Sequence, residues 1–420
     1  MRVAVVGGGW AGLAAAVRAV EAGHNVTLME MAPHWGGRAR AVDHDGLRLD
    51  NGQHILIGAY THTLALMRRV GAEPDTLLDR RPLVLRYPDG SGLQLPRGPA
   101  LPAFVRAVFA AQGWTWRERL ALLAAAARWR AARFRAPPQQ TVAGLMRGLP
   151  ARLREDLIDP LCIAALNTPA ERASAQVFLR VLHDALFAGP GAADLLLPRA
   201  PLSALLPTPA AAWLRRAGAH VELTRRVMTL EAAGNGWALD GERYDAVVLA
   251  SSATEAGRLT HAVAPAWSAQ ASAFDYEPIV TVWLRSAGSR LEQPLTALRA
   301  APDAPAQFVF DLGALDGPDG IFAFVVSGAR DGLERAGLAG MAAAVLRQAT
   351  TALLWQTPPA LLHQAAERRA TFVCAPGLKR PPAAVAPRLA AAGDYIAGPY
   401  PATLEGAVRA GEAAVRVACG

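Results

Sequence analysis

Residues 1–30 read MRVAVVGGGWAGLAAAVRAVEAGHNVTLME, and this stretch decides the fold of the chain. Its hydrophobic periodicity predicts, in order, a strand, a helix and a second strand over residues 2–6, 11–22 and 25–30. A strand, a helix and a strand in this order form a βαβ unit, whose two strands lie parallel in one sheet. The opening of the chain therefore predicts an α/β domain.

A glycine-rich turn joins the first predicted strand to the helix. Gly7, Gly9 and Gly12 fit the pattern G-x-G-x-x-G. The first glycine permits a tight turn, the second lets the backbone approach a pyrophosphate, and the third lets the helix pack closely on the strand. The helix start at Trp10 and Ala11 presents unpaired N–H groups and a partial positive charge to the phosphates. The turn predicts a dinucleotide site.

An acidic residue stands where such a site needs one. Glu30 ends the second predicted strand 18 residues after Gly12. A carboxylate there accepts hydrogen bonds from the adenosine ribose hydroxyls and repels a 2′-phosphate. We include the neighbouring Met31 in the predicted nucleotide site.

A second glycine motif follows within residues 33–40, which read PHWGGRAR. Gly36, Gly37 and Arg38 resemble the motif found after the second strand in flavoproteins of the glutathione-reductase and amine-oxidase types. In those proteins the glycines and the arginine run past the pyrophosphate. The resemblance implies that the dinucleotide is FAD rather than NAD.

The end of the chain carries a third motif. Gly393 and Asp394, followed by the segment over residues 400–411, resemble the second flavin motif of the amine oxidase and phytoene desaturase superfamily. The resemblance implies that Asp394 binds the ribityl chain or the pyrophosphate. It also implies that the start of the last helix, at Thr403, Leu404 and Glu405, faces the isoalloxazine ring, and that the backbone at Val227 lies against the adenine.

Two internal segments make the resemblance more specific. Residues 49–60 (LDNGQHILIGAY) and residues 160–179 look like the hydroxysqualene dehydroxylases of bacterial hopanoid synthesis. The resemblance implies that hydroxysqualene is reduced to squalene: loss of an allylic hydroxyl leaves a cation, and reduced FAD supplies hydride from its N5 atom.

The same resemblance suggests residues at the reaction centre. Gly52, Gln53 and His54 sit where family loops pass the flavin ring, and His54 is the candidate catalytic group beside the leaving hydroxyl. Asn167 and Thr168 are candidates for binding the substrate. A hydrogen-bonded structural histidine and a helix-ending Asn-Thr-Pro turn are the alternatives for these positions.

Three other functions compete with dehydroxylation. A carotenoid or phytoene desaturase would use the same flavin to remove hydrogens. An amine oxidase typically places a lysine beside the flavin N5 atom, and Lys379 is the only lysine here. A non-catalytic isoprenoid carrier of the GDP dissociation inhibitor type would not need the flavin-facing motif at the end of the chain.

The pattern along the chain predicts three regions around one cofactor. We expect a discontinuous FAD-binding, Rossmann-like domain from residues 1–75, 210–265 and 383–420. A helical membrane or substrate region would occupy residues 76–209, and an inserted α+β part with a substrate-binding mixed sheet would occupy residues 266–382.

Composition narrows the remaining choices. The net charge of +8 invites a nucleic-acid function, but 42 of the 43 basic residues are arginines, mostly scattered singly, so we expect no nucleic-acid partner. Three separated cysteines and the lack of a signal-peptide pattern predict a cytoplasmic protein. Residues 43–45, Asp-His-Asp, lack a second ligand pair and predict a hairpin tip, so we expect no metal.

One segment predicts contact with a membrane surface. Arginines and tryptophans flank apolar residues over residues 114–134, a composition that suits the headgroup interface. We expect peripheral association with the inner face of the cytoplasmic membrane, and an ordinary helix pair with a solvated arginine face is the alternative.

Overall fold

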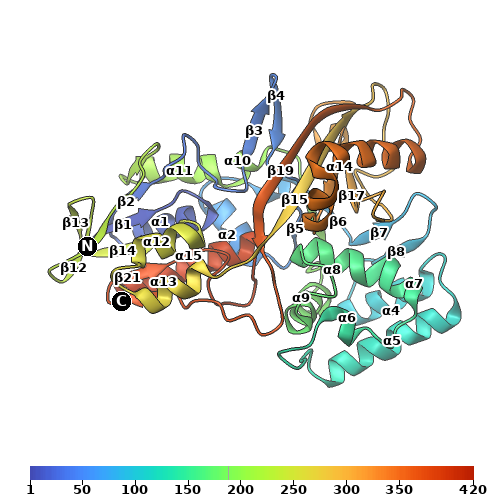
Figure 1. Cartoon of the computed structure of the whole chain (residues 1–420), viewed down its shortest axis with the longest axis horizontal. Coiled ribbons are helices and arrows are strands. Elements are labelled where there is room, and N and C mark those ends of the chain that lie inside the picture. The colour runs from blue at the N-terminus through green and yellow to red at the C-terminus, as the bar shows by residue number, and fades with distance from the viewer. Residues whose placement is uncertain (188) are drawn as a thin grey trace.

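The computed structural model describes residues 1–187 and 189–420. Both termini lie at one end of the molecule, beside a six-stranded sheet, and a group of helices forms the opposite end (Figure 1). The sheet has the order β10-β2-β1-β14-β21-β20. Its strands are β1 Arg2–Val6, β2 Asn25–Met29, β10 His220–Glu222, β14 Ala246–Leu249, β20 Ala384–Ala386 and β21 Leu389–Ala391.

The first five strands in this order are parallel, and only β20 pairs antiparallel. The central strand β1 is a run of valine and alanine that is buried beyond its first residue, as expected for a strand covered on both faces. The predicted βαβ unit is therefore confirmed. The α/β fold class is confirmed with it.

Two helices from opposite ends of the chain cover this sheet. Helix α1, Trp10–Glu21, packs against α15, Leu404–Cys419. A Cβ atom added at Gly411 would lie 2.2 Å from the carbonyl oxygen of Ala11, so only a glycine allows the two helices to approach this closely. The beginning and the end of the sequence are thus packed into one layer.

Smaller elements complete this end of the molecule. A three-stranded antiparallel sheet follows β10, and two helices follow β14. They are β11 Leu230–Ala233, β12 Gly236–Leu239, β13 Glu242–Tyr244, α12 Ala253–Thr260 and α13 Pro265–Ser272. Strand β11 begins only at Leu230, so Val227 lies outside it.

A second, antiparallel sheet has the order β16-β17-β18-β15-β19. Its strands are β15 Tyr276–Arg285, β16 Leu295–Ala297, β17 Phe308–Asp311, β18 Ile321–Val326 and β19 Ala360–Phe372, and α14 Arg330–Ala352 packs against β15 and β19. The sequence analysis missed β19, because the Glu-Arg-Arg run at residues 367–369 interrupts the apolar pattern that marks a buried strand.

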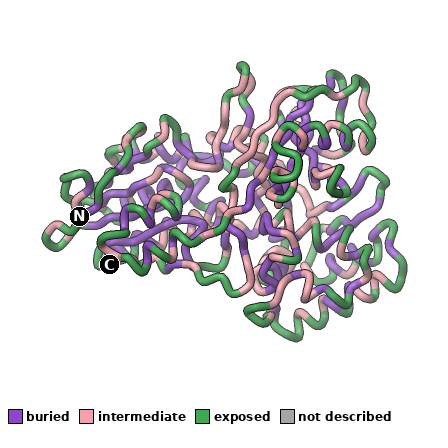
Figure 2. The backbone as a smooth tube through the Cα atoms, viewed as in Figure 1, coloured by how far each residue is buried: buried purple, intermediate pink, exposed green. Residues whose placement is uncertain are grey.

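Helices fill most of the region between residues 100 and 216. They are α4 Ala100–Ala110, α5 Trp116–Ala131, α6 Val142–Leu145, α7 Ala151–Leu153, α8 Asp159–Leu166, α9 Ala175–Phe187, α10 Leu202–Leu205 and α11 Pro207–Arg216, with a π-helical turn at Arg154–Ile158. Figure 2 shows buried backbone through the middle of the molecule and exposed backbone along its outer loops and the outer helices. The predicted domain boundaries stay a prediction.

The remaining elements lie between the two ends. They are the hairpin of β3 Ala41–His44 and β4 Leu47–Asp50, the strands β5 Leu56–Ile57, β6 Leu78–Arg81, β7 Val84–Arg86, β8 Gly92–Gln94 and β9 Leu195–Pro198, and the helices α2 Thr61–Arg69 and α3 Pro74–Leu77. The hairpin turns at Asp45 and Gly46, both with positive φ, so the hairpin predicted around residues 43–45 is confirmed.

Candidate functional site

The predicted nucleotide motifs meet at one edge of the six-stranded sheet. The glycine turn follows β1, Glu30 follows β2, and Gly393 and Asp394 come shortly after β21. These three strands are parallel, so their carboxyl ends lie at the same edge. In open α/β sheets, ligands bind at this edge. Segments that are far apart in the sequence are therefore brought together by the topology.

Each glycine of the first turn has a distinct environment. Gly7 has a φ of 113°, and a Cβ atom there would lie 2.5 Å from the carbonyl oxygen of Ala250. A Cβ atom on Gly12 would lie 1.8 Å from the carbonyl oxygen of Gly7, so this position holds the helix against the strand. At Gly9 the nearest atom would be 3.9 Å away, at Gly37. The protein itself leaves open the space above Gly9, as a bound pyrophosphate requires.

The second glycine motif lies directly against the first. The N–H group of Gly36 donates a hydrogen bond of 2.9 Å to the carbonyl oxygen of Gly8. Gly9 and Gly36 form an isolated parallel bridge, and Gly37 has a φ of 60°. The two turns together form a cradle of backbone without side chains. Such a surface suits the close approach of a phosphate group.

Glu30 is fixed at the edge of this cradle. Its carboxylate is buried and accepts hydrogen bonds from the N–H groups of Gly8, at 2.6 Å, and Ala32, at 2.7 Å. A carboxylate oxygen can accept more than one hydrogen bond. Glu30 can therefore hold the glycine turn and still accept bonds from ribose hydroxyls, while the neighbouring Met31 is largely exposed.

An ion pair joins the second and third motifs. A guanidinium nitrogen of Arg38 lies 2.6 Å from a carboxylate oxygen of Asp394, and the charge of Asp394 raises the pKa of Arg38. Arg38 also donates a hydrogen bond of 2.6 Å to the carbonyl oxygen of Ala370, in β19. This arginine therefore connects both ends of the chain to the second sheet.

The loop with Gln53 and His54 lies where these parts meet. The side-chain amide of Asn51 donates to the carbonyl oxygen of Arg38, at 2.9 Å, and to Glu367 of β19, at 3.2 Å. A Cβ atom on Gly52 would lie 3.7 Å from the hydroxyl of Thr281 in β15. The predicted loop is thus held between the nucleotide end and the antiparallel sheet.

His54 has a defined protonation pattern. Burial lowers the pKa of its imidazole from the ordinary value of 6.5 and so favours the neutral form. Its Nδ1 atom lies 3.2 Å from the carbonyl oxygen of Gly52, which can only accept a hydrogen bond. Nδ1 therefore carries the hydrogen, and Nε2 is left as an acceptor. A catalytic role for His54 stays a prediction.

At the start of α15, the side chain of Glu405 is used within the protein, and the predicted contact of this residue with the cofactor stays a prediction for its backbone. Its carboxylate is fully buried and accepts hydrogen bonds from the N–H groups of His62 and Thr63, from the Thr63 hydroxyl, and from Arg409. The side chain thus caps helix α2 and pairs with Arg409. It is not available to a cofactor, so any contact with one must come from the backbone of this turn.

The backbone of the same turn has N–H groups that no carbonyl within the helix can accept from. The hydroxyl of Thr403 accepts the N–H group of Gly406 at 2.9 Å and so caps the helix. The N–H groups of Leu404 and Glu405 belong to the first helical turn, where no carbonyl within the helix can serve them. These groups are the ones that could face a ring.

Asn167 and Thr168 are given a different function by the structure. Asn167 ends α8 with a φ of 46°; its amide donates to the Glu277 carbonyl and the Thr371 hydroxyl, and its oxygen accepts the N–H group of Gly328. Thr168 is fully buried between the Leu166 carbonyl and the Cys374 N–H group. These hydrogen bonds fit the alternative of a helix-ending turn, because they engage the side-chain polar atoms of both residues, and substrate binding by the two residues stays a prediction.

Val227 and Trp10, two predicted nucleotide-binding residues, both make hydrogen bonds within the protein. Val227 is buried outside any strand, and its carbonyl oxygen accepts a hydrogen bond of 2.8 Å from Arg258. Only its N–H group is left to face an adenine. The indole of Trp10 donates to the carbonyl oxygen of Ala39 and thereby ties α1 to the second motif. Their contact with a nucleotide stays a prediction.

Two buried polar groups were missed by the sequence analysis. The Tyr395 hydroxyl and the Trp283 indole N–H have no hydrogen-bond partner within the described part of the chain. Burial also raises the pKa of Tyr395. Trp283 shares one face of the β15–β19 pair with Thr281 and with His363, whose ring stacks on it at 5.3 Å. Buried polar groups are normally satisfied, so these two groups mark space that a ligand could fill.

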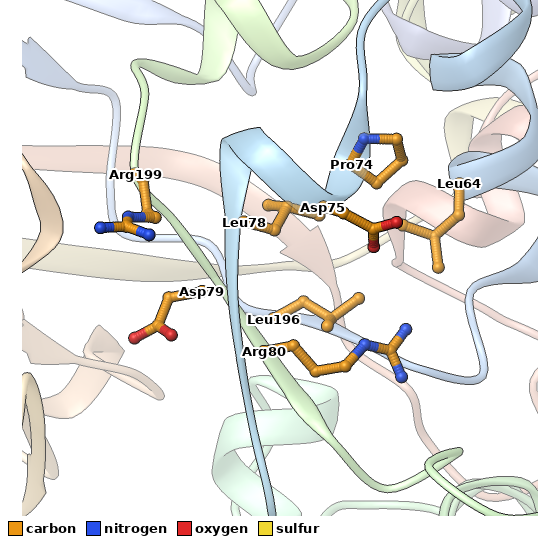
Figure 3. Close-up of a pocket in the computed structure, with 8 residues that line it drawn as sticks. All are labelled: Leu64, Pro74, Asp75, Leu78, Asp79, Arg80, Leu196 and Arg199. Atoms are coloured by element: carbon orange, nitrogen blue, oxygen red, sulfur yellow. The ribbon is translucent and has the colours of Figure 1, made fainter.

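Two cavities lie away from this edge. The first, of about 280 Å³, is lined by Asp75, Asp79, Arg80, Arg199 and apolar neighbours (Figure 3). The second, of about 320 Å³, is lined largely by apolar residues, among them Leu95, Ala103 and Leu186. No predicted cofactor or substrate residue lines either cavity.

Two other kinds of site are absent from the described residues. Among the described residues, no three histidine, cysteine or acidic side chains are grouped so that they could hold a metal ion. No helix in the described chain is both long and apolar enough to cross a bilayer.

Comparison with known proteins gives one family match over nearly the whole chain. The profile of the family described as flavin containing amine oxidoreductase matches residues 10–419. Among solved structures, an oxidoreductase from Methanosarcina mazei has a TM-score of 0.74 at 15% identity, covering 99% of this chain and 100% of that one. Cyclohexylamine oxidase from Brevibacterium oxydans has a TM-score of 0.69 at 18% identity, covering 99% and 98%. These structures share the fold.

Curated relatives fall into two groups. A probable zeta-carotene desaturase from Synechococcus elongatus is 47% identical, but over 73 residues, which are 17% of this chain and 15% of that protein. The hydroxysqualene dehydroxylase of Sinorhizobium fredii is 27% identical over 99% of this chain and 98% of its own length. That of Zymomonas mobilis is 26% identical over 99% and 98%. The local match is stronger with one group, and the full-length match is with the other.

Proposed function

The chain belongs to the flavin-containing amine oxidoreductases, and from this premise we propose that it uses FAD to convert hydroxysqualene to squalene. The full-length likeness to hydroxysqualene dehydroxylases carries the proposal. The desaturase matches cover less than a fifth of the chain. FAD is the cofactor of the family, and the enzyme is an oxidoreductase.

The residues present fit FAD. The open space above Gly9, between two glycine turns, suits a pyrophosphate. Glu30 can accept hydrogen bonds from the ribose hydroxyls, and the Arg38–Asp394 pair would contact the ribityl chain or the pyrophosphate if FAD follows the course that the family motif implies. The N–H groups of Leu404 and Glu405 would favour negative charge on the ring.

When bound in its reduced form, FADH2 would supply both hydrogens of the reaction, a hydride from N5 and a proton, and so turn the C–OH group of the substrate into C–H and water. The chain contributes burial and orientation. His54, neutral and with Nε2 as an acceptor, can take a hydrogen bond from the substrate hydroxyl and so orient it. It cannot donate the proton from Nε2 in this form. Burial of Trp283 would help to exclude water that could otherwise recapture an allylic cation.

The competing functions are less well supported. Lys379 is exposed in the loop after β19, and a catalytic lysine beside a flavin would have to be buried with it. The isoprenoid carrier would need no acceptor for the substrate hydroxyl and no helix start directed at a ring. Carotenoid desaturation would use the same cradle in the opposite redox direction.

One incubation distinguishes these functions. The purified holoenzyme, reduced with dithionite under nitrogen, is mixed with hydroxysqualene, and squalene is measured by gas chromatography. Phytoene and zeta-carotene with the oxidised enzyme serve as the comparison. Squalene formation supports the proposal. Its absence from a yellow preparation that desaturates a carotene would overturn it in favour of desaturation, and a colourless preparation that retains isoprenoid would indicate a carrier.

A further inference from the structure

The positive charge of the chain is concentrated on one pair of helices. Residues 97–135, which include α4 and α5, contain eight arginines and a single acidic residue, Glu118. This segment therefore carries a net charge of +7, which leaves +1 for all other residues out of the total of +8. Most arginines of the chain are scattered singly, and this segment, which includes the predicted membrane-facing residues 114–134, is the exception.

These arginines are not used to stabilise the fold by ion pairs. Arg117, Arg128, Arg130, Arg133 and Arg135 are all exposed. None of the eight has an acidic side chain in salt-bridge distance within the described chain, whereas arginines elsewhere form many such pairs. Their charge is thus free to act on a partner outside the molecule.

Exposed apolar side chains project from the same two helices. Leu101 and Phe109 of α4 are each 40% exposed, and Trp116 and Leu120 of α5 are 64% and 58% exposed. The rings of Phe109 and Trp116 are in contact, with centroids 5.8 Å apart, so the apolar side chains of both helices converge. Large apolar side chains gathered on a surface mark a binding site more often than isolated ones do.

We infer that the α4–α5 surface, defined by these four apolar residues and the surrounding arginines, docks on a bilayer that contains anionic phospholipids. Arginines attract phosphate headgroups, and tryptophan, phenylalanine and leucine enter the boundary between headgroups and acyl chains. A nucleic acid would use the charge but would leave the apolar side chains in water. Helix α5 lies at the outer edge of the molecule, away from the six-stranded sheet (Figure 1).

The position of the second cavity agrees with this docking. Ala100 and Ala103 of α4 line it, next to the exposed Leu101. An apolar compound leaving the bilayer at α4 would meet this cavity first. The docking itself is inferred from charge and exposure alone and does not depend on the proposed reaction.

Vesicle binding tests the inference with matched controls. The FAD-loaded full chain is sedimented with vesicles of phosphatidylcholine alone and of phosphatidylcholine with 30% phosphatidylglycerol. The basic variant Arg128→Gln/Arg130→Gln is compared with Arg215→Gln/Arg216→Gln, which removes two exposed arginines of α11. The apolar variant Trp116→Ser/Leu120→Ser is compared with Leu354→Ser, at a side chain that is 95% exposed.

We expect binding to the anionic vesicles that weakens about tenfold or more in the basic variant, because each arginine near an anionic surface contributes roughly fivefold. The apolar variant should also weaken binding, 0.5 M NaCl should reduce it, and both controls should bind like the parent. Bound flavin and the unfolding midpoint verify that each variant is folded. No vesicle binding, equal binding to neutral vesicles, or binding to RNA that the apolar variant leaves unchanged would each overturn the inference.

Discussion

Replacing Gly9 with valine tests the cofactor cradle most directly. A Cβ atom at Gly9 would have its nearest protein neighbour 3.9 Å away, and φ at this position is −74°, which any residue adopts. The apoprotein should therefore fold, losing at most about 1 kcal/mol because valine is a poorer residue than glycine at a helix start. The valine side chain would instead occupy the space assigned to the pyrophosphate.

The expected loss of affinity follows from the contacts that the valine would remove. Hydrogen bonds between backbone N–H groups and a charged phosphate are each worth about 1.5–3 kcal/mol. Losing the equivalent of 3 kcal/mol weakens binding about 100-fold. The assay is titration of the apoprotein with FAD, followed by quenching of flavin fluorescence, together with chemical denaturation of each apoprotein.

Two other glycines give the necessary controls. Gly148 has no atom within 4 Å of an added Cβ, so Gly148→Val should change neither stability nor FAD affinity. Gly12→Ala would place its Cβ 1.8 Å from the Gly7 carbonyl oxygen and should prevent stable folding. If Gly9→Val folds and still binds FAD with the parent affinity, then the dinucleotide does not pass along this turn, and the assigned site is wrong.

Three further predictions separate structural roles from functional ones. Glu405→Gln should lower the free energy of unfolding by about 3 kcal/mol, because a buried, paired carboxylate is lost. The FAD affinity of the folded protein should change less than about threefold. Weaker FAD binding without a loss of stability would show that this side chain contacts the cofactor. Asn167→Ala should lower the free energy of unfolding, measured by chemical denaturation, by about 2 kcal/mol and leave KM for hydroxysqualene unchanged. A raised KM at unchanged stability would show that Asn167 binds the substrate. Burial raises the pKa of Asp50 from 3.8 to about 7, so the folded chain binds this proton more tightly than the unfolded chain, and the free energy of unfolding falls as the pH rises from about 4 to about 7. The difference in stability between Asp50→Asn and the parent should therefore be more favourable to the variant at pH 8 than at pH 5. Identical pH profiles of the two proteins would contradict this.

The nucleotide end could be predicted well because its signals are local. The strand, glycine turn, helix and acid within residues 1–30 depend on neighbours in the sequence, and the strand and helix bounds agree to within one residue. The approach of residues 393–405 to this edge could be expected only from the family resemblance. Its physical cause, parallel pairing of β14 with β21, is a long-range contact that periodicity does not reveal.

The second sheet and the side-chain roles were harder to predict. In β19, the outward-facing charges belong to a long edge strand of the sheet, so its pattern does not resemble a buried strand. Asn167 and Glu405 are polar residues inside recognisable motifs, which made a ligand contact the natural hypothesis. In the fold they bind the backbone N–H groups of His62 in α2 and of Gly328, and the backbone carbonyl of Glu277 in β15, and such partners are known only once the chain is folded.

Because the polar side chains of the motifs are hydrogen-bonded within the protein, few groups are left that could orient the substrate. Asn167, Thr168 and Glu405 have their hydrogen-bonding atoms engaged by the protein, and Glu30 and Asp394 are held at the nucleotide edge. A reaction that removes a hydroxyl from an apolar chain needs few polar groups, because each one would bring water with it. Within the described residues, the Trp283 indole N–H has no hydrogen-bond partner, and the hydrogen bond of the His54 ring is made by Nδ1 and not by Nε2. His54 belongs to the Gly52 loop, and Trp283 belongs to β15, whose Thr281 lies next to Gly52. One acceptor and one donor are sufficient to hold one hydroxyl group, so we expect specificity for a hydroxylated isoprenoid to depend on these two side chains more than on the Asn-Thr-Pro turn.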